Sequence, residues 1–299
     1  MKRRSFLAGL SLLAACGKTS KKIRLALNWK PDPQFGGFYA APYEKHGLDV
    51  EVLPGGAGTP TVQMIGAGSA EFGIVSADEL VLARAGGNDV VALFATFQNC
   101  PQGIMVHASR NLSSIGDVVK EGTLAIQKGL PYARLLEKKY GFDHVQVVPS
   151  PGGDISAFLH DEKFAQQCFI MSEPLQAMHA GVAVKVFPVS DIGYNPYTTV
   201  LAVSEKMLAS EKVAAMVVAV REGWQTYLND AKATNERMHG LNPGMDMATF
   251  TEVSDAQKPF IETPVLGTMT DERWKTLIGQ LKDLGDITKA IPAKECFRG

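Results

Sequence analysis

Short apolar runs alternate with stretches of helical periodicity along most of this sequence, from residue 23 to residue 203. This alternation predicts βαβ units built on a mostly parallel sheet. The expected strands are residues 23–28, 48–53, 72–75, 90–96, 103–107, 123–126, 145–148, 167–171, 184–187 and 198–203. The expected helices are residues 37–46, 60–67, 77–85, 132–140, 155–159, 174–180, 211–229, 231–239, 247–258 and 271–284. Two similar sets of strands and helices, followed by a helical tail, predict an α/β protein with two lobes and a closing segment.

The amino-terminal segment, residues 1–15, has the pattern of an export signal. Three basic residues at positions 2–4 precede an apolar run at positions 6–15. A bilayer span needs about 20 apolar residues, so this run indicates a secretory signal peptide and not a transmembrane helix. The run ends in Leu-Ala-Ala-Cys-Gly, and the small residues before Cys16 resemble the lipobox of bacterial lipoproteins. In those proteins the cysteine is acylated and becomes the first residue after cleavage.

We therefore expect an exported protein held to a cell membrane by a lipid on Cys16, facing the periplasm or the cell exterior. Residues 16–22 are polar and lysine-rich, which is typical of a short tether. An ordinary signal peptide that contains a cysteine is the alternative. The stretch Arg-Arg-Ser-Phe-Leu at positions 3–7 also resembles a twin-arginine motif, so both export routes stay open, as do both membranes of a diderm cell.

Composition sets further bounds. After cleavage roughly 280 residues remain, which is enough for two domains of ordinary size. The sequence is 45% hydrophobic and 20% charged with a net charge of -1, so nothing suggests a nucleic acid partner. Three cysteines remain besides Cys16, at positions 100, 168 and 296, and their wide spacing implies neither a zinc site nor a disulfide framework. One disulfide is possible in an oxidising compartment, and the sequence does not select the pair.

Polar and aromatic side chains follow the predicted strands. In open α/β sheets ligands bind beyond the carboxyl ends of the strands, so these positions are candidates for a binding site. The candidates are Asn28, Trp29, Ser76, Asp78, Gln98, Gly153, Glu173, Asn195 and Tyr197. Amides, hydroxyls, carboxylates and two large aromatic rings suit a small polar ligand that is itself aromatic. Arginine and lysine are missing from this set, which disfavours a strongly anionic ligand.

Each candidate also has a purely structural explanation. Glu173 and Asp78 each fall in a helical first turn, where a carboxylate complements the helix dipole. Trp29 and Tyr197 could be core residues, although the irregular stretch after Trp29 favours a stacking role. Gly153 could serve only a turn, or it could allow the backbone to approach a ligand closely.

Catalytic patterns are missing from the sequence. It contains no Gly-x-Ser-x-Gly, no phosphate-binding glycine loop and no histidines at metal-ligand spacing. We therefore expect a binding protein and not an enzyme, with no catalytic residues, metal or cofactor.

The sequence of residues 27–40, LNWKPDPQFGGFYA, resembles the opening motif of the NMT1/THI5-like proteins. These are substrate-binding proteins of ABC importers and related pyrimidine synthases. Further blocks of similarity, in the same order as in the family, are residues 47–50, 66–73, 172–174 and 195–199. The resemblance runs from about residue 23 to about residue 229.

The resemblance implies the periplasmic-binding-protein type II fold, in which two α/β lobes close on a ligand by a hinge. It places lobe one at residues 22–100 plus 200–299 and lobe two at 101–199. Trp29 would stack on the ligand and Glu173 would accept its ring amino protons, which suits an aminopyrimidine precursor of thiamine. The implied partners are an ABC permease and a small-molecule ligand, and we expect a monomer.

Two departures from the family leave the ligand open. The synthase branch uses a lysine and a histidine where this sequence aligns Val75 and Asp78, which disfavours the enzyme. Pyrimidine-binding members often carry a histidine where this sequence has Phe35, preceded by Gln34, and both residues are added to the candidate site. Riboflavin and sulfonates therefore remain alternative ligands, and a sensor with a membrane receptor remains an alternative role.

Overall fold

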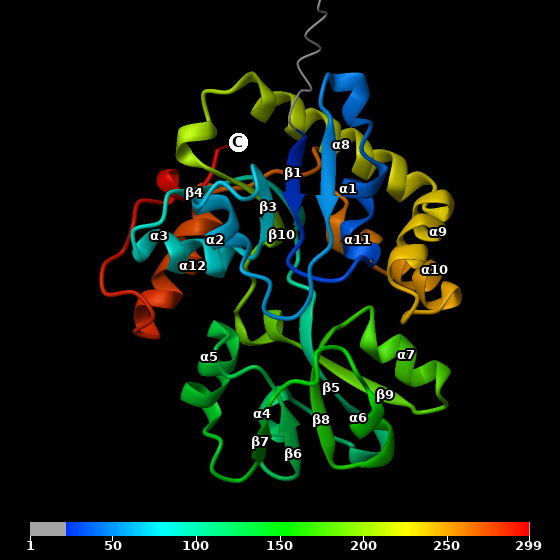
Figure 1. The fold of residues 1–299 in the computed structure, drawn as a ribbon. Helices are drawn as coiled ribbons and strands as arrows, with labels where there is room; N and C mark the ends of the chain where they lie inside the picture. The colour runs from blue at the N-terminus through cyan, green and yellow to red at the C-terminus, as the bar shows by residue number, and fades with distance from the viewer. Residues whose placement is uncertain (1–21, 299) are drawn as a thin grey trace, which may run out of the picture.

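The computed structural model describes residues 22–298, so the predicted signal peptide and Cys16 lie outside the described residues. Its strands form two five-stranded sheets, one in each of two lobes (Figure 1). The first sheet has the order β2 (Val50–Leu53), β1 (Ile23–Ala26), β3 (Phe72–Val75), β10 (Thr198–Ser204), β4 (Val90–Phe97). The second has the order β7 (Gln146–Val148), β6 (Thr123–Ala125), β8 (Phe164–Phe169), β5 (Gln102–His107), β9 (Val184–Pro188). We call the parts around these sheets lobe one and lobe two.

The helices are distributed unevenly along the chain. Those before β10 are short, whereas the segment after β10 is almost wholly helical, as the sequence predicts. The α-helices are α1 (Gly36–Ala40), α2 (Thr61–Gly66), α3 (Ala77–Ala85), α4 (Ile115–Val118), α5 (Pro131–Tyr140), α6 (Ser156–His160), α7 (Glu173–His179), α8 (Glu211–Asn229), α9 (Lys232–Leu241), α10 (Met247–Ala256), α11 (Lys258–Ile261), α12 (Asp271–Asp283) and α13 (Ala293–Cys296). The 3₁₀ turns are η1 (Pro33–Phe35), η2 (Tyr43–His46), η3 (Ala108–Arg110), η4 (Val189–Ile192) and η5 (Glu205–Met207).

Four of the five strands in each sheet run in the same direction, as the prediction of mostly parallel sheets requires, and one strand in each sheet runs against them. β1 pairs in parallel with β2 and β3, but β10 runs antiparallel to both β3 and β4. The second sheet repeats this arrangement, because β5 runs antiparallel to β8 and β9 while β6 pairs in parallel with β7 and β8. These two antiparallel strands begin where the chain enters each lobe from the other one, so their direction follows from the crossing and not from a βαβ unit.

Two of the boundaries that differ from the sequence prediction have a clear physical reason. The helix expected at residues 37–46 is divided into α1 and η2, since Pro42 cannot continue a helix. The strand expected at 167–171 lies at Phe164–Phe169, because the polar pair Gln166 and Gln167 belongs to it and Gln166 is fully buried.

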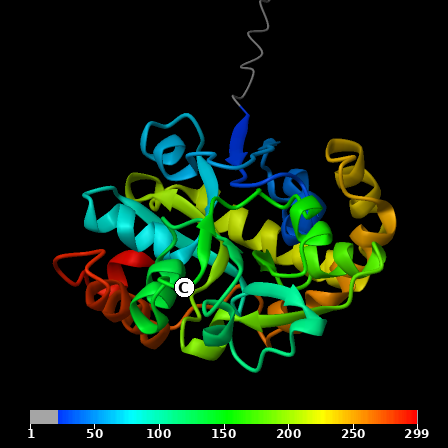
Figure 2. The same cartoon turned by 90° about the horizontal axis from the view of Figure 1, so that it is seen from below.

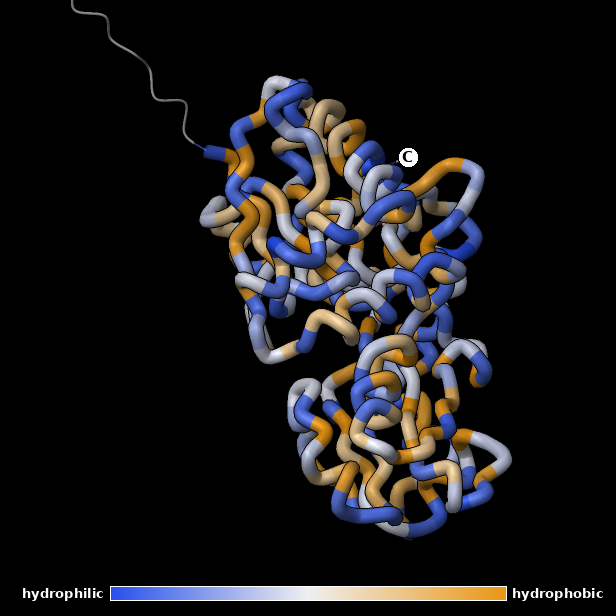
Figure 3. The backbone as a smooth tube through the Cα atoms, turned by 90° about the vertical axis from the view of Figure 1, so that its right-hand side faces the viewer, coloured by the Kyte–Doolittle hydropathy of each residue, from blue (hydrophilic) through white to orange (hydrophobic). Residues whose placement is uncertain are grey.

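Helices cover both faces of the first sheet. Residues of α2, α3 and α12 pack on one face, and residues of α1 and α8 pack on the other. In lobe two, Phe158 and Ala177 from α6 and α7 pack against Met105 of β5. The two lobes lie one above the other (Figure 3). Helices α9 and α10, yellow to orange, stand at one side of the molecule when it is seen from below (Figure 2).

Candidate functional site

A cleft of about 790 Å³ lies between the two lobes. Its volume falls within the range of about 300–1,000 Å³ that is typical of small-molecule sites. Residues that follow β1 and β3 in lobe one and β6, β7 and β8 in lobe two line it, so the parallel strands of both sheets end toward it. Seven of the predicted site residues line this cleft: Asn28, Trp29, Gln34, Ser76, Asp78, Gly153 and Glu173. The other four, Phe35, Gln98, Asn195 and Tyr197, do not.

Trp29 lies at the point where lobe one meets lobe two. A Cβ atom added at Gly152 would lie 3.6 Å from Cη2 of the indole, and one added at Gly153 would lie 3.8 Å from Cζ2. Both glycines have positive φ, 65° and 91°, a conformation that other residues adopt only with strain. The turn therefore needs glycine for its backbone shape, and it places the edge of the ring against lobe two.

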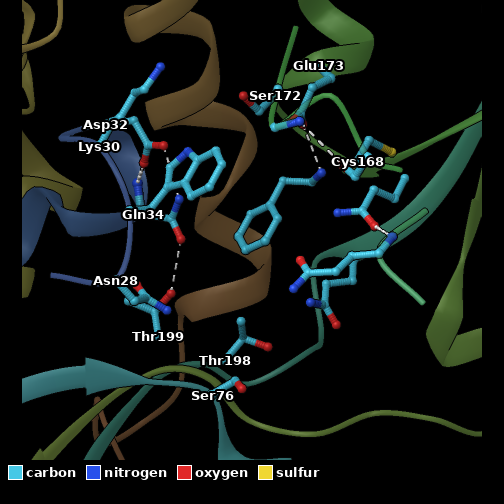
Figure 4. A pocket seen from close by; sticks show the side chains of 18 of the residues that line it. Asn28, Lys30, Asp32, Gln34, Ser76, Cys168, Ser172, Glu173, Thr198 and Thr199 are labelled. Carbon is cyan, nitrogen blue, oxygen red and sulfur yellow. Dashed lines mark hydrogen bonds between the residues drawn. The ribbon is translucent and has the colours of Figure 1, made fainter. Parts of the chain in front are cut away.

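Glu173 opens α7 on the opposite wall of the cleft (Figure 4). Its Oε2 accepts a hydrogen bond of 2.9 Å from the backbone N–H of Phe169. Oε1 lies 3.6 Å from the position that a Cβ on Gly153 would take. Burial raises the pKa of Glu173 to about 7. A carboxylate that only complemented a helix dipole would face solvent, whereas this one is half-buried beside the turn that meets Trp29.

Asp32 and Gln34 form a bonded pair in the wall of lobe one, as Figure 4 shows. Oδ1 of Asp32 accepts from the backbone N–H of Gln34 at 3.0 Å, and Oδ2 accepts from its Nε2 at 3.0 Å. Oε1 of Gln34 in turn accepts from the hydroxyl of Thr199 at 3.4 Å. Burial raises the pKa of Asp32 to about 7, against the effect of the Gln34 hydrogen bonds and with a smaller contribution from the charge of Glu173.

Asp78 accepts hydrogen bonds from more protein groups than the other cleft carboxylates do. It accepts hydrogen bonds from the hydroxyl of Ser76, from the hydroxyl of Tyr194 at 2.8 Å and from the backbone N–H of Glu79 at 2.9 Å. These contacts fix the start of α3, so Asp78 and Ser76 have a clear structural role in addition to lining the cleft. Glu79 beside them also lines the cleft, and its pKa is raised to about 7 by burial and then by the charge of Asp78.

The charge of the cleft is strongly one-sided. Within residues 22–298, five carboxylate side chains line it, on Asp32, Asp78, Glu79, Asp154 and Glu173. In the same part of the chain one lysine, Lys30, and no arginine line it. A wall of this kind attracts ligands that donate hydrogen bonds or carry positive charge, and it repels anions.

The described residues contain neither a metal-binding cluster nor a helix that could span a membrane. Among them, no three histidine, cysteine, aspartate or glutamate side chains converge as a metal site would require. No helix between residues 22 and 298 is long and apolar enough to span a bilayer. Cys100, Cys168 and Cys296 are buried free thiols.

A sequence model of the family described as NMT1/THI5 like matches residues 32–234. This chain belongs to that family. The match covers both lobes and most of the cleft wall, and it ends in α9. The resemblance inferred from residues 27–40 and the later blocks is therefore confirmed. No curated protein matches the sequence.

Solved structures show the fold of this NMT1/THI5-like protein. It is similar to the periplasmic aliphatic sulphonate binding protein SsuA from Escherichia coli, with a TM-score of 0.71 and 14% identity over 94% of this chain and 93% of that one. The alkanesulfonate-binding protein SsuA from Xanthomonas axonopodis pv. citri, bound to MOPS, gives 0.66 and 13% over 93% and 98%. The Candida albicans CA3427 gene product, described as having the generic periplasmic binding protein fold, gives 0.61 and 15% over 93% and 96%. The predicted periplasmic-binding-protein fold is confirmed.

Three of the four predicted residues outside the cleft lie in the two connections between the lobes, residues 98–101 and 193–197, which we call the hinge. Arg273 of α12 donates to the backbone oxygen of Gln98 at 2.5 Å and to that of Asn195 at 2.8 Å, so it joins both connections between the lobes. Its guanidinium lies 3.8 Å from the ring centre of Tyr197, whose hydroxyl accepts from the N–H of Thr270. Phe35, the fourth, has no exposed surface and packs in the core of lobe one.

We expect Arg273→Ala to lower the free energy of unfolding by about 2 kcal/mol, because two charged hydrogen bonds and a cation–π contact are lost together. Thermal denaturation measures the effect. Lys275→Ala on the same helix is the control, since Lys275 is exposed and pairs with Asp271 one turn away. Equal stability of the two variants would show that Arg273 does not hold the hinge.

Several cleft residues were not predicted, most of them because they do not follow a strand. Glutamines inside β5 and β8, threonines at the start of β10 and residues of the helical tail all reach the cleft. The missed residues include Lys30, Asp32, Glu79, Gln102, Tyr132, Gln167, Thr198, Thr199, Asn242, Met245 and Gln257. Asp32 could have been selected from the sequence, because it lies within the family motif, two residues before the predicted site residue Gln34.

The raised pKa values predict how stability depends on pH. Asp32, Glu79 and Glu173 each hold a proton more tightly in the folded protein, with a pKa of about 7, than in the unfolded chain. The stabilising effect of protonation is complete below the unfolded value near pH 4 and is lost as the pH rises through about 7. We therefore expect the Tm of the ligand-free protein to rise by roughly 3–6 °C between pH 8 and pH 5.

Differential scanning calorimetry at a series of pH values measures this rise. The double variant Asp32→Asn and Glu173→Gln should flatten the profile. Carboxyl groups with a lowered pKa, such as that of Glu71 beside Arg24, have the opposite effect, because their protonation destabilises the folded protein. That loss of stability occurs only at more acid pH. A Tm that falls steadily from pH 8 to pH 5 would contradict the assigned burial of these carboxyls.

Proposed function

We propose that this protein is an extracytoplasmic solute-binding protein of an ABC importer that captures a small nitrogen heterocycle, such as a pyrimidine precursor of thiamine. Membership of the NMT1/THI5-like family and the periplasmic-binding-protein fold support a binding role. Trp29 offers a face for stacking on the ring, and Glu173 offers a carboxylate to an amino group and ring nitrogen from the other lobe.

The observation that carries this proposal is the charge of the cleft. Two of the similar structures are named as sulfonate-binding proteins, and a sulfonate is a permanent anion. Here five carboxylates and one lysine line the cleft within the described residues, so an anion would be repelled. An aminopyrimidine, which presents N–H donors on a planar ring, fits the same groups.

Riboflavin is the second candidate. The cleft volume of about 790 Å³ lies in the upper part of the usual range for small-molecule sites, and it leaves room for a ring system larger than one pyrimidine. A flavin would stack on Trp29 in the same way, but it lacks the amino group that would pair with Glu173.

Isothermal titration calorimetry with three probes tests these assignments. We expect tight binding of 4-amino-5-hydroxymethyl-2-methylpyrimidine, weaker or no binding of riboflavin, and no binding of an alkanesulfonate. Mass spectrometry of ligand that co-purifies with the native protein is the independent check. Tight sulfonate binding without pyrimidine binding would overturn the proposal.

The location and partners of the protein belong to the same proposal. We place a lipid on Cys16, which lies outside the described residues, with residues 16–22 as the tether and a monomer docking on an ABC permease. Lobe one would comprise residues 22–100 and 200–299, and lobe two residues 101–199.

Cys16→Ser should release the protein from the membrane fraction. A sensor role would require a receptor in place of the permease, and neighbouring genes would distinguish the two.

A further inference from the structure

Two consecutive glutamines of β8 project from opposite faces of the second sheet and have different surroundings. Gln166 is fully buried, and its Nε2 donates to the backbone oxygen of Asp154 at 3.0 Å. Gln167 is only half-buried and lines the cleft. Within residues 22–298 its Nε2 makes no hydrogen bond, and this nitrogen keeps accessible surface. Gln166 therefore serves the structure, whereas Gln167 has donors that a ligand in the cleft can reach.

The orientation of the Gln167 amide is fixed by its neighbours. Oε1 accepts from the backbone N–H of Gln127 at 2.6 Å and from the hydroxyl of Tyr132 at 3.4 Å. A backbone N–H can only donate, so the atom that meets it is the oxygen and the free atom is the nitrogen. These two bonds occupy both lone pairs of Oε1. Gln167 therefore offers the cleft two N–H donors and no acceptor.

A second amide lies beside it on β5. Gln102 is paired directly with Phe169 in the register of β5 and β8, and Gln167 precedes Phe169 by two residues. The three side chains therefore share one face of the sheet, and the two glutamines are diagonal neighbours about 7–8 Å apart. Gln102 is half-buried and lines the cleft. Its Oε1 accepts from the thiol of Cys100 at 3.6 Å, and its Nε2, which keeps accessible surface, has no partner in the described chain.

Phe169 connects these donors to the carboxylate of Glu173. Its backbone N–H donates to Oε2 of Glu173 at 2.9 Å, and its half-buried side chain also lines the cleft. The Phe169 ring meets that of Phe97 edge-on, with 6.1 Å between the ring centres. Because Phe169 is bonded to the carboxylate and shares a sheet face with both glutamines, one small ring can contact all three groups.

The chemistry of the two amides limits what they can bind. A pair of N–H donors requires an acceptor atom on the ligand. Neither amide carries a charge, and the carboxylates that line the cleft repel an anion. An uncharged oxygen substituent meets both conditions.

We propose that Gln102 and Gln167 form a donor subsite on lobe two that binds an uncharged oxygen substituent of the ligand, beside Glu173. This inference rests on the proposed function and narrows its ligand to a nitrogen heterocycle with two kinds of substituent. An amino group pairs with Glu173, and a neighbouring oxygen accepts from the glutamines. A heterocycle without that oxygen would leave both amides to water and bind less tightly.

A matched pair of probes tests the subsite by titration calorimetry. One is 4-amino-5-hydroxymethyl-2-methylpyrimidine, and the other carries a methyl group in place of the hydroxymethyl arm, so the two differ by a single oxygen atom. We expect the wild-type protein to prefer the hydroxymethyl compound by roughly three- to tenfold, the usual difference for an uncharged hydrogen bond. Gln167→Met and Gln102→Met keep the length of each side chain without its N–H donors. Each should reduce the preference, and the double variant should abolish it.

The control is Gln146→Met. Gln146 is an exposed residue of β7 on the same lobe and does not line the cleft, so its loss should leave the preference unchanged. Thermal unfolding of each variant confirms that it is folded. A variant that only disturbed the structure of the lobe would weaken the binding of both probes by the same factor, which would not change the preference.

The outcomes separate the subsite from the proposed function. Equal wild-type affinity for both probes, or a preference that survives in the double variant, would overturn the subsite while the proposed function stands. If the wild type bound neither probe, the proposed function would fail and the subsite with it.

Discussion

Glu173→Gln is expected to weaken the binding of a 4-aminopyrimidine by about 100-fold, since a charged hydrogen bond contributes roughly 1.5–3 kcal/mol and the new amide would direct an N–H group at the ligand's own amino group. The variant should fold normally. The amide oxygen of glutamine can still accept the backbone N–H of Phe169, the one hydrogen bond that Oε2 makes in the structure. Titration calorimetry at pH 8, above the raised pKa of about 7, measures the loss with the carboxylate ionised.

Glu137→Gln is the matched control, because Glu137 is an exposed carboxylate of α5 on the same lobe. It should leave the affinity unchanged. The affinity of the wild type for an uncharged aminopyrimidine should also decline as the pH falls below about 7, because protonated Glu173 loses one acceptor. An unchanged dissociation constant in Glu173→Gln would remove Glu173 from the binding site, and riboflavin would then become the stronger candidate.

Gly223→Ala is expected to destabilise the protein by about 3 kcal/mol, although alanine is the better helix former. Gly223 lies inside α8, and a Cβ atom there would come within 2.1 Å of the backbone oxygen of Gly37. A backbone atom of a packed helix cannot move aside as a flexible side chain could. The contact explains the Gly-Gly pair of the family motif, since Gly36 and Gly37 lie directly against Tyr227 and Trp224 of α8.

The control for this prediction is Gly279→Ala. Gly279 lies inside α12, and a Cβ atom added there would have no neighbour within 4 Å. We therefore expect this variant to gain up to about 1 kcal/mol from helix propensity alone. Urea denaturation of the two variants beside the wild type gives both values. A stabilised Gly223→Ala would show that α1 and α8 are not in close contact.

Much of the fold could be predicted from the sequence, because the periodicity of apolar residues is local. The strand at residues 72–75 and the helices at 77–85 and 211–229 have the predicted ends. Strand order and direction are not local properties. Nothing in the apolar run of β10 shows that it lies between β3 and β4 and antiparallel to both.

The candidate site was predictable to the extent that ligands bind at strand ends. That rule selects Asn28, Ser76 and Glu173, which line the cleft. The same reasoning also selects Gln98, which follows β4, and Asn195, which precedes β10. Both lie where the chain passes between the lobes, and Arg273 binds their backbone oxygens in the hinge. Lining residues from the helical tail, such as Asn242 and Gln257, follow no strand, so only the assembled structure brings them to the cleft.

The position of β10 also determines the order in which the two lobes can be completed. β10 is an inner strand of the first sheet, yet all five strands of the second sheet precede it in the chain. A ribosome or an export channel delivers the chain from its amino terminus, so every strand of lobe two emerges before the first sheet receives β10. Pairing β10 with β3 also closes a loop of more than a hundred residues, which is slow unless the intervening lobe has already become compact. The lobe that contains the first strand of the chain is therefore the last to be finished.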